Sequence, residues 1–285
     1  MAYLDNVPLF NKANLINERR LQMDLGLEGK KVLITGGGSG IGLETAKLLN
    51  QEGANVILLD KNTDKIDSNT FATPRNVVSY QCDVTRPENL QDIHQKLVTQ
   101  DRKVDILIHC AGITGAQGDF SDISLEEWHD VFDVNLFGAV NTTKEFLSDF
   151  ENNGWGRIIF IASEDGQQPY SDEIPYCCTK AGVLALSKGL SRTLGRKNIL
   201  VNTVSPAFIN TPMTDRMMKK RADQLGVSFD EAIRSFLNAK RPYMTSQRRG
   251  KAVEVANVIA FLCSEKASFI NGSEYRVDAG SVATI

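Results

Sequence analysis

Short apolar runs alternate along the chain with longer segments in which apolar residues recur at helical spacing. Seven runs have the length and composition of buried strands, and they cover residues 31–35, 55–59, 77–82, 104–109, 157–162, 200–204 and 273–277. Helical periodicity predicts helices over residues 43–52, 90–99, 125–150, 176–195 and 254–264. This rhythm predicts an α/β fold, in which right-handed crossovers build one doubly wound parallel sheet of about seven strands with helices on both faces.

The strand series runs through most of the chain without a break, which favours one large domain over two small ones. We expect a single domain over residues 28–285, preceded by an N-terminal extension over residues 1–27. Residues 212–249 have helical character but stand before the last predicted helix and strand. We call this insertion the lid.

Composition and charge exclude several classes of protein. The 285 residues carry 32 Lys and Arg against 35 Asp and Glu, and 42% of them are hydrophobic. Disorder would need fewer apolar residues, and a nucleic-acid partner would favour a basic excess. The apolar runs are too short to span a membrane. Five cysteines without a CxxC pair, and three scattered histidines, predict no metal site and favour the reducing cytoplasm.

A glycine-rich loop follows the first predicted strand and opens the first predicted helix, over residues 35–42. Glycines at such a turn let the backbone approach a pyrophosphate closely, and the N–H groups at the helix start then face the phosphates. A glycine-rich turn alone is weak evidence, but the order of strand, loop and helix supports a dinucleotide site. The expected contacts include Gly36, Ser39, Gly40, Ile41 and Gly42.

Asp60 ends the second predicted strand, where its carboxylate can accept hydrogen bonds from both hydroxyls of an adenosine ribose. The same carboxylate would repel a 2′-phosphate, so we expect NAD rather than NADP. Lys61 is the complication, since a basic neighbour could tolerate that phosphate. The loop itself carries Ser39 and no Arg or Lys, which again favours NAD.

A candidate catalytic group lies near the fifth strand and the helix that follows it. Ser163 stands just beyond that strand, at the edge where open α/β sheets bind ligands. Tyr176 and Lys180 are four residues apart, so they share one helix face. We expect the Lys ammonium to lower the pKa of the Tyr phenol, which could then exchange a proton with an alcohol or ketone. Tyr-x-x-x-Lys alone would indicate only a surface pair.

With these residues in place, the chain resembles the short-chain dehydrogenase/reductase family over about residues 30–280. The family's TGxxxGxG motif matches Thr35, Gly36, Gly40 and Gly42, and its Ser, Tyr and Lys match Ser163, Tyr176 and Lys180. The resemblance implies a Rossmann fold and adds Asn135 as a fourth catalytic residue. It further implies cofactor contacts from Asp83, Val84, Ala111, Gly112, Tyr176, Lys180, Pro206, Ile209 and Thr211.

Two departures from the family pattern affect the cofactor site. Where the family usually has Asn-Asn-Ala-Gly, this chain has His109-Cys110-Ala111-Gly112, which removes the first Asn side chain. Where the family has PGxxxT, Ala207 replaces the Gly, and a Cβ there restricts positive φ. Neither change removes a catalytic group.

The resemblance implies that Tyr176 is the general acid/base for a secondary alcohol or its ketone, while Ser163 binds the substrate oxygen. It implies that Lys180 binds the nicotinamide ribose and tunes Tyr176, and that Asn135 holds a water linking Lys180 to solvent. Related proteins are commonly tetramers, so we expect a homotetramer or homodimer.

The substrate is not decided by the sequence, because the two walls of its predicted site disagree. The lid has nine basic residues against four acidic ones, which favours an anionic substrate or an acidic carrier protein. Glu164 and Asp165 directly follow Ser163, and Asp172 and Glu173 stand in the loop before Tyr176. Carboxylates there would suit the hydroxyl groups of a polyol or sugar, or a basic substrate. Both sets could equally be solvated. Glu164, Asp165 and, in the lid, Met213 are the candidate substrate contacts.

Three functions stay open at this point. The first is an NAD(H)-dependent alcohol dehydrogenase or ketone reductase acting on a small substrate. The second is a 3-oxoacyl-thioester (acyl-carrier-protein) reductase, which would normally use NADPH. The third, disfavoured because all four catalytic positions are kept, is a dinucleotide-binding regulatory protein without turnover.

Overall fold

The computed structural model describes residues 23–285. Within that range seven parallel strands form one sheet in the order β3-β2-β1-β4-β5-β6-β9, which confirms the doubly wound α/β prediction. The predicted N-terminal extension lies outside the described residues, apart from residues 23–27. The strands are β1 (Lys31–Thr35), β2 (Asn55–Asp60), β3 (Val77–Gln81), β4 (Ile106–His109), β5 (Gly156–Ile161), β6 (Ile199–Pro206) and β9 (Glu274–Val277).

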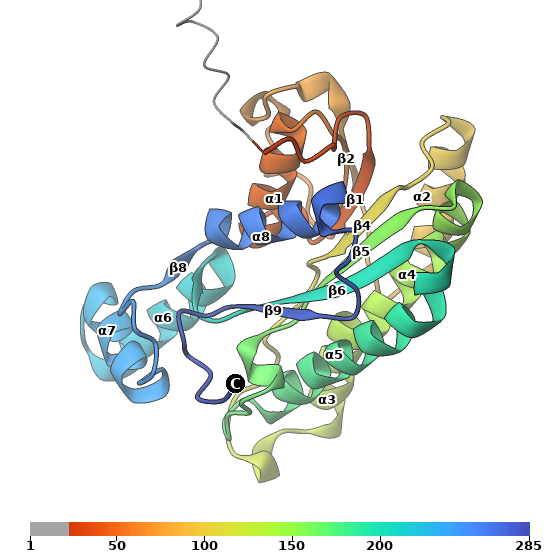
Figure 1. Cartoon of the computed structure of the whole chain (residues 1–285). Coiled ribbons are helices and arrows are strands. Elements are labelled where there is room, and N and C mark those ends of the chain that lie inside the picture. The colour runs from red at the N-terminus through yellow and green to blue at the C-terminus, as the bar shows by residue number, and fades with distance from the viewer. Residues whose placement is uncertain (1–22) are drawn as a thin grey trace, which may run out of the picture.

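Helices cover both faces of this sheet (Figure 1). On one face lie α1 (Gly40–Gln51) and α8 (Ala252–Cys263), and on the other α2 (Pro87–Thr99), α4 (Gly138–Asn153) and α5 (Ile174–Leu194). Neighbouring side chains of a strand point to opposite faces. In β1, Val32 and Ile34 therefore pack under α1 and α8, whereas Leu33 packs under the other layer. The central strands β1, β2, β4, β5 and β6 are thus buried on both sides, whereas the edge strands β3 and β9 are partly exposed.

The helix predicted over residues 125–150 is divided in two. It consists of α3 (Leu125–Phe132) and α4, joined by a wide π-helical turn over Asp133–Phe137. This turn directs the Asn135 side chain to the chain just after β4, where the amide nitrogen donates to the Ile113 carbonyl (2.9 Å) and the amide oxygen accepts from the Ile113 N–H (2.8 Å). Apolar spacing carries no signal for such a turn, because it leaves the helical pattern nearly intact.

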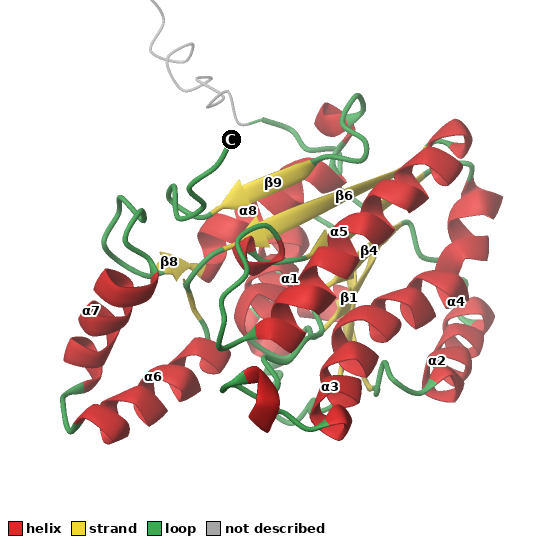
Figure 2. Cartoon of the chain, turned by 90° about the horizontal axis from the view of Figure 1, so that it is seen from below, coloured by secondary structure: helices red, strands yellow, loops and turns green. Residues whose placement is uncertain are grey.

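The lid forms a small layer of its own beside the carboxyl ends of the strands (Figure 2). It contains α6 (Pro212–Leu225) and α7 (Phe229–Lys240), and the short strands β7 (Ile209–Asn210) and β8 (Gly250–Lys251) pair at its base. Phe208, Met218, Phe236, Leu237 and Met244 form a separate apolar core beneath it. Apolar residues of the lid thus face inward, while Lys219 and Lys220 are exposed.

Candidate active site

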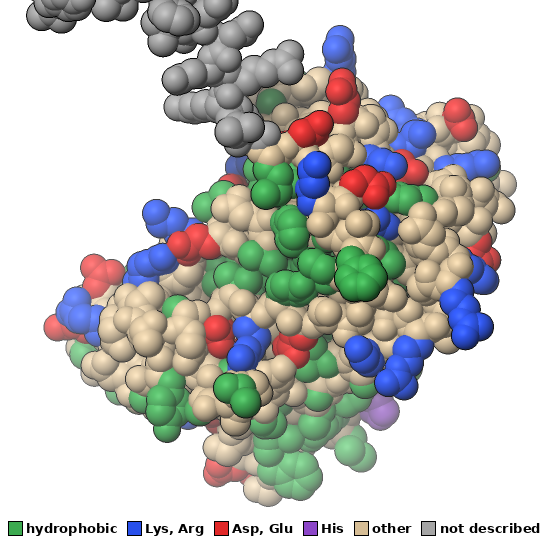
Figure 3. All heavy atoms as spheres, in the orientation of Figure 1, with side chains coloured by type: hydrophobic (Ala, Val, Ile, Leu, Met, Phe, Trp, Pro, Cys, Tyr) green, Lys and Arg blue, Asp and Glu red, His purple; other side chains and the backbone are tan. Residues whose placement is uncertain are grey.

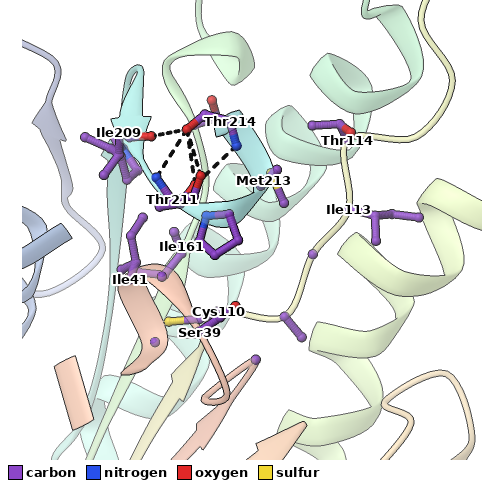
Figure 4. Close-up of a pocket in the computed structure, with 18 of the residues that line it drawn as sticks. Ser39, Ile41, Cys110, Ile113, Thr114, Ile161, Ile209, Thr211, Met213 and Thr214 are labelled. Atoms are coloured by element: carbon purple, nitrogen blue, oxygen red, sulfur yellow. Dashed lines mark hydrogen bonds between the residues drawn. The ribbon is translucent and has the colours of Figure 1, made fainter. Parts of the chain in front are cut away.

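A cavity of about 350 Å³ lies at the carboxyl ends of the central strands. Gly36 follows β1, Cys110 follows β4, Ala162 follows β5 and Pro206 ends β6, and all four line the cavity. In Figure 4, Thr211 and Met213 from the start of α6 approach it from one side, with Ile113 and Thr114 on another. The cavity occupies the edge at which open parallel sheets bind their ligands, on both sides of the point where strand order reverses.

One end of this cavity, which we call the cofactor end, is built from backbone. Gly36 has a φ of +64°, and a Cβ there would lie 2.8 Å from the Ala111 nitrogen. A Cβ on Gly42 would collide with the Gly36 carbonyl. Both positions therefore require glycine, and Gly36, Ser39, Gly40, Ile41 and Gly42 all line the cavity.

The start of α1 is open toward a ligand. Ser39 occupies the N-cap position, yet within the described residues its side chain makes no capping hydrogen bond. By contrast, α3, α6 and α7 each begin with a complete capping box. Uncapped N–H groups at the start of a twelve-residue helix provide an anion site. The residues present therefore fit the pyrophosphate of a dinucleotide cofactor.

The Asp60 carboxylate lies at the edge of the cofactor end and accepts hydrogen bonds from the Gly38 N–H (2.8 Å) and the Asn62 N–H (3.0 Å). Lys61, the complicating residue of the sequence argument, is turned to Asp83, with 3.0 Å between Nζ and Oδ2. Burial alone would raise the pKa of Asp83, but hydrogen bonds from Thr85 and Lys61 lower it. Asp83 lies beside the cavity between two lining residues, Cys82 and Val84.

Ser163, Tyr176 and Lys180 are brought together by β5 and α5. All three line the cavity, and the Lys180 Nζ donates to the Ile161 carbonyl at 2.9 Å, which holds the ammonium at the end of β5. The Lys180 Nζ lies 5.5 Å from the centre of the Tyr176 ring. The four-residue spacing on one helix face thus produces the predicted juxtaposition.

The electrostatics differ from the expected picture in one respect. Burial, with the charge of Asp165, raises the pKa of Tyr176 rather than lowering it. Burial likewise lowers the pKa of Lys180 to about 8. Desolvation by the cavity walls is therefore a larger effect on the phenol than the Lys180 charge, whose own bond is to a backbone carbonyl.

Asn135 lies behind the cavity wall rather than in it. Besides its two bonds to Ile113, its amide nitrogen donates to Thr179 Oγ1 (3.1 Å) on the helix turn before Lys180. A Cβ on Gly112 would lie 3.2 Å from the Asn135 amide oxygen and 3.6 Å from Lys180 Nζ. The Asn135 amide oxygen and the Lys180 ammonium therefore both lie beside Gly112.

The two departures from the family pattern are accommodated without distortion. His109 Nδ1 lies 2.9 Å from Thr35 Oγ1, which also accepts from the Ala111 N–H, so this pair links the ends of β1 and β4. Burial lowers the pKa of His109 to about 3 and keeps it neutral. Ala207 is absent from the described non-glycine residues with positive φ, which are Asp101, Asn198, Gln247 and Ala279.

The other end of the cavity, the substrate end, is built from charged side chains. Asp165, Glu173 and Arg241 line it together with Met213 and Met217. Arg241 directly follows α7, is only 6% exposed, and pairs through Nε with the Glu164 carboxylate. Glu164 itself is 1% exposed and is not among the described residues that line the cavity.

Most residues chosen from the sequence therefore meet at one place. Seventeen of the twenty candidates line the cavity, while Asp83, Asn135 and Glu164 lie just behind its wall. Sequence reasoning noted Glu173 as a carboxylate near the site but did not select Arg241 as a site residue. Arg241 is one of nine basic residues in the lid, and no spacing distinguishes it from the solvated ones.

Comparisons with known proteins agree with this geometry. Residues 36–282 match a family described as enoyl-(acyl carrier protein) reductase. An uncharacterized oxidoreductase, YvrD, from Bacillus subtilis is 35% identical over 92% of this chain and 100% of its own. The 3-oxoacyl-[acyl-carrier-protein] reductase FabG of Thermotoga maritima is 34% identical over 90% of this chain and 99% of its own.

A solved structure shares the whole architecture. L-sorbose reductase from Gluconobacter frateurii, complexed with NADPH and L-sorbose, superposes with a TM-score of 0.85 at 29% identity, covering 92% of this chain and 100% of its own. The matches extend over the glycine loop, the Ser, Tyr and Lys positions and the lid alike. The chain belongs to the short-chain dehydrogenase/reductase family and is an oxidoreductase.

Proposed function

We propose that this protein is an NAD(H)-dependent oxidoreductase that interconverts a secondary alcohol and its ketone. The observation that carries the proposal is the meeting of Ser163, Tyr176 and Lys180 in the wall of a cavity whose other end has an open helix N-terminus. A phenol and a hydroxyl at the reacting end suit proton transfer to and from an oxygen. The open helix suits a phosphate group.

A bound nicotinamide would accept or supply the hydride at the substrate carbon. Tyr176 takes the hydroxyl proton when the alcohol is oxidised and returns it when the ketone is reduced. Ser163 donates a hydrogen bond to the same oxygen and stabilises the charge that develops on it. Lys180 supplies a positive charge beside the phenol, and its bond to the Ile161 carbonyl fixes where that charge lies.

Asn135 is assigned as a positioning residue for the proton path. Its amide is fixed by three hydrogen bonds, and its amide oxygen lies beside Gly112, as does the Lys180 ammonium. A water held there would join Lys180 to solvent. The cofactor contacts proposed for Ala111, Gly112, Pro206, Ile209 and Thr211 follow from their places along the same cavity.

The choice of NAD(H) rests on the charges at the adenosine end. Asp60 presents a carboxylate there, and Lys61 is paired with Asp83 instead of facing the Asp60 side. A 2′-phosphate would therefore be repelled by the Asp60 carboxylate, and the neighbouring Lys61 ammonium, already paired with Asp83, would not offset that repulsion. The L-sorbose reductase holds NADPH, so family membership alone does not decide the cofactor.

A 3-oxoacyl-thioester reductase using NADPH is the second candidate, favoured by the 34% identity to FabG. The basic lid surface that would attract an acyl carrier protein includes the exposed Lys219 and Lys220. Reduction of acetoacetyl thioester with NADPH, at a higher kcat/KM than any alcohol or ketone with NAD(H), would establish this alternative.

The direct test of the catalytic assignment is Tyr176→Phe. We expect turnover to fall by about 100- to 10,000-fold, because the proton donor and acceptor is removed. NADH binding, measured by fluorescence titration, should be nearly unchanged. Tyr243→Phe is the control, since Tyr243 is an exposed lid residue. Turnover of Tyr176→Phe near the wild-type rate would refute the assignment.

The cofactor proposal is tested by thermal shift with NADH and with NADPH. NADH should stabilise the wild-type protein more strongly, and Asp60→Asn should narrow that difference because a repulsive charge is lost. Glu44→Gln, a helix-surface change paired only with Lys47, serves as the charge-matched control. Stronger stabilisation of the wild type by NADPH would overturn the proposal.

We infer a homotetramer or homodimer from the exposed apolar side chains. Figure 3 shows hydrophobic side chains gathered over α8. Val253 in α8 and Phe269, shortly after it in the chain, are among the exposed apolar residues of the described range. Light scattering at micromolar concentration tests this, and a monomer would contradict it. Among residues 23–285, none of the helices has the length and apolar character that a membrane span needs. Location in the cytoplasm stays a prediction.

A further inference from the structure

Three carboxyl groups and one guanidinium meet at the substrate end of the cavity. Glu164, Asp165 and Glu173 are each at least nine-tenths buried, and so is Arg241. Arg241 contacts Glu164 through Nε, approaches Asp165 Oδ1 to 3.5 Å through Nη2, and stacks its guanidinium carbon 3.9 Å from the centre of the Tyr170 ring. A buried charge group of this kind needs partners for every charge or it destabilises the fold.

The partners within the cluster are unequally shared. Glu164 faces away from the cavity and neutralises Arg241. Lys240, which directly precedes Arg241, pairs with Asp172 at 2.9 Å and so does not neutralise a carboxylate of the cluster. Asp165 and Glu173 both line the cavity. Asp165 shares Arg241 with Glu164 at the longer distance of 3.5 Å, and Glu173 Oε1 accepts a hydrogen bond from Gln117 Nε2 (2.8 Å). The cluster thus holds two carboxyl groups beyond what its cation balances.

These two carboxyl groups face the reacting side chains. Their charges act directly on Tyr176, and the backbone N–H of Asp165 donates to Ser163 Oγ at 3.3 Å. Burial, followed by the charge of Asp165 and a hydrogen bond with it, raises the pKa of Glu173 to about 8. Burial raises the pKa of Asp165 as well, and the charge of Arg241 and a hydrogen bond with Glu173 oppose that rise. The two neighbouring carboxyl groups can therefore hold one proton between them, so that the pair both donates and accepts hydrogen bonds.

A substrate bound at Ser163 and Tyr176 would place its far side against this pair. A hydroxyl group can accept from one carboxyl and donate to the other, whereas a carboxylate or phosphate would face buried negative charge. Of the lid's basic residues, Arg216 and Arg241 line the cavity, but Arg216 is exposed to solvent and Arg241 is already paired with Glu164.

We propose that Asp165 and Glu173 are the specificity-determining residues of this enzyme, and that they select a neutral substrate with a further hydroxyl near the reacting carbon, such as a sugar, polyol or cyclic diol. This inference rests on the proposed function. It resolves the conflict between the basic lid and the acidic loop: the loop faces the cavity, and most of the lid's positive charge does not.

The test uses three probes that share one ring: trans-1,2-cyclohexanediol, cyclohexanol and 2-hydroxycyclohexanecarboxylate, each with NAD⁺. For the wild-type protein we expect the diol to exceed the other two in kcat/KM by about tenfold or more, the worth of a hydrogen bond to a charged group. In Asp165→Asn the ratio of diol to cyclohexanol should fall, and the carboxylate should gain relative to both. Glu173→Gln should lower the ratio of diol to cyclohexanol less than Asp165→Asn does, because the glutamine amide can still donate a hydrogen bond to the substrate.

Asp172→Asn is the matched control, because it changes a carboxylate of the same loop that is partly exposed and lies away from the cavity. Its ratios should equal those of the wild type. Arg216→Gln separates the second source of charge, and it should leave the diol preference in place. Equal kcat/KM for diol and cyclohexanol in the wild type, or an unchanged ratio in Asp165→Asn, would overturn the inference.

Binding is measured in parallel by saturation-transfer NMR on the NADH-bound protein, with the diol and cyclohexanol competing. Preferential diol binding that Asp165→Asn abolishes supports the inference even where no probe is turned over, and that result would count against the proposed function alone. Turnover of all three probes without any diol preference in rate or binding would leave the proposed function intact and reject the inference.

Discussion

The two ends of the cavity differ in which part of the chain lines them: backbone groups at the cofactor end and charged side chains at the substrate end. The cofactor end is backbone: glycines that admit no side chain, an open helix N-terminus and the ends of parallel strands. The substrate end is side chain: Arg241 of the lid meets Glu164, Asp165 and Glu173 of a loop more than sixty residues away in the chain. Backbone presents one fixed pattern of donors, which suits a ligand that never changes. Side chains can be exchanged singly, which suits a ligand that differs among relatives.

The largest expected effect on stability comes from Arg241→Met, which disrupts the charged cluster at the substrate end. Removing one partner of a buried ion pair leaves Glu164 uncompensated and should cost about 3–5 kcal/mol in the free energy of unfolding, measured with urea. Arg248→Met, whose partner Glu254 is exposed, should change stability very little.

The double variant Arg241→Met/Glu164→Leu sharpens that result. It removes both charges of the buried pair, so most of the lost stability should return. If Arg241→Met were as stable as the wild type, the ion pair between Arg241 and Glu164 would contribute nothing to the stability of the fold.

Breaking the cofactor end needs only a methyl group. Gly36→Ala places a residue with a side chain in the left-handed region, which should lower the free energy of unfolding by about 1–2 kcal/mol. The new methyl group would also press against the Ala111 backbone, which should lower it by about 1–3 kcal/mol more. Urea unfolding and NADH titration should both register the change. Gly189→Ala, in the middle of α5 with open space around it, should instead stabilise the protein slightly. Unaltered NADH affinity in Gly36→Ala would show that the loop is not the rigid cradle described.

The pH dependence of stability separates the substrate end from the helical layer behind the sheet. The pKa of Glu173 is raised to about 8, so the folded state binds a proton that the unfolded state releases above its usual value. Stability should therefore fall as pH rises from about 4.5 toward 8. Urea unfolding of Glu173→Gln across this range should show a smaller fall. Part of the fall should persist, because burial also raises the pKa of Glu164, to about 7, and that of Asp165.

His94 supplies the contrasting case. Its ring contacts Asp149 (3.1 Å) and Glu145 (2.8 Å), and hydrogen bonding to Asp149 is the main reason its pKa is raised. A raised histidine pKa gives stability that is complete below about 6.5 and lost as pH rises through the folded value. His94→Gln should remove this later loss alone. Of these two windows, only that of Glu173 extends below pH 6.5, so a fall in stability between about pH 4.5 and 6.5 that disappeared in His94→Gln would contradict the assignment.

The smallest effect concerns helix starts. Ser228 caps α7 by accepting from the Glu231 N–H, so Ser228→Ala should cost about 1 kcal/mol and lower Tm by about 2–4 °C. Ser39 makes no such bond among the described residues, so Ser39→Ala should leave Tm unchanged. A drop in Ser39→Ala as large as in Ser228→Ala would show that the start of α1 is capped and not open for a ligand.

The same contrast explains how much could be predicted from the sequence. The seven strands and the cavity at their ends follow from apolar runs, glycines and fixed spacings, all of which are local signals. The turn at Asn135 and the burial of Arg241 follow from tertiary contacts, which local periodicity does not encode. The pKa of Tyr176 was expected to fall because the Lys180 charge was counted and the desolvation was not.

The Arg241 contact has a mechanical consequence. The chain enters and leaves the lid at its base, where β7 and β8 pair with each other, and the lid contacts the body again behind α7, where Arg241 enters the cluster and Lys240 reaches Asp172. A segment tethered at both points cannot swing away as a rigid flap. Any opening that admits substrate must bend the far corner, around Gly226 between α6 and α7, or unseat a buried guanidinium. The route of entry is therefore set by the same ion pair that balances the charge of the pocket.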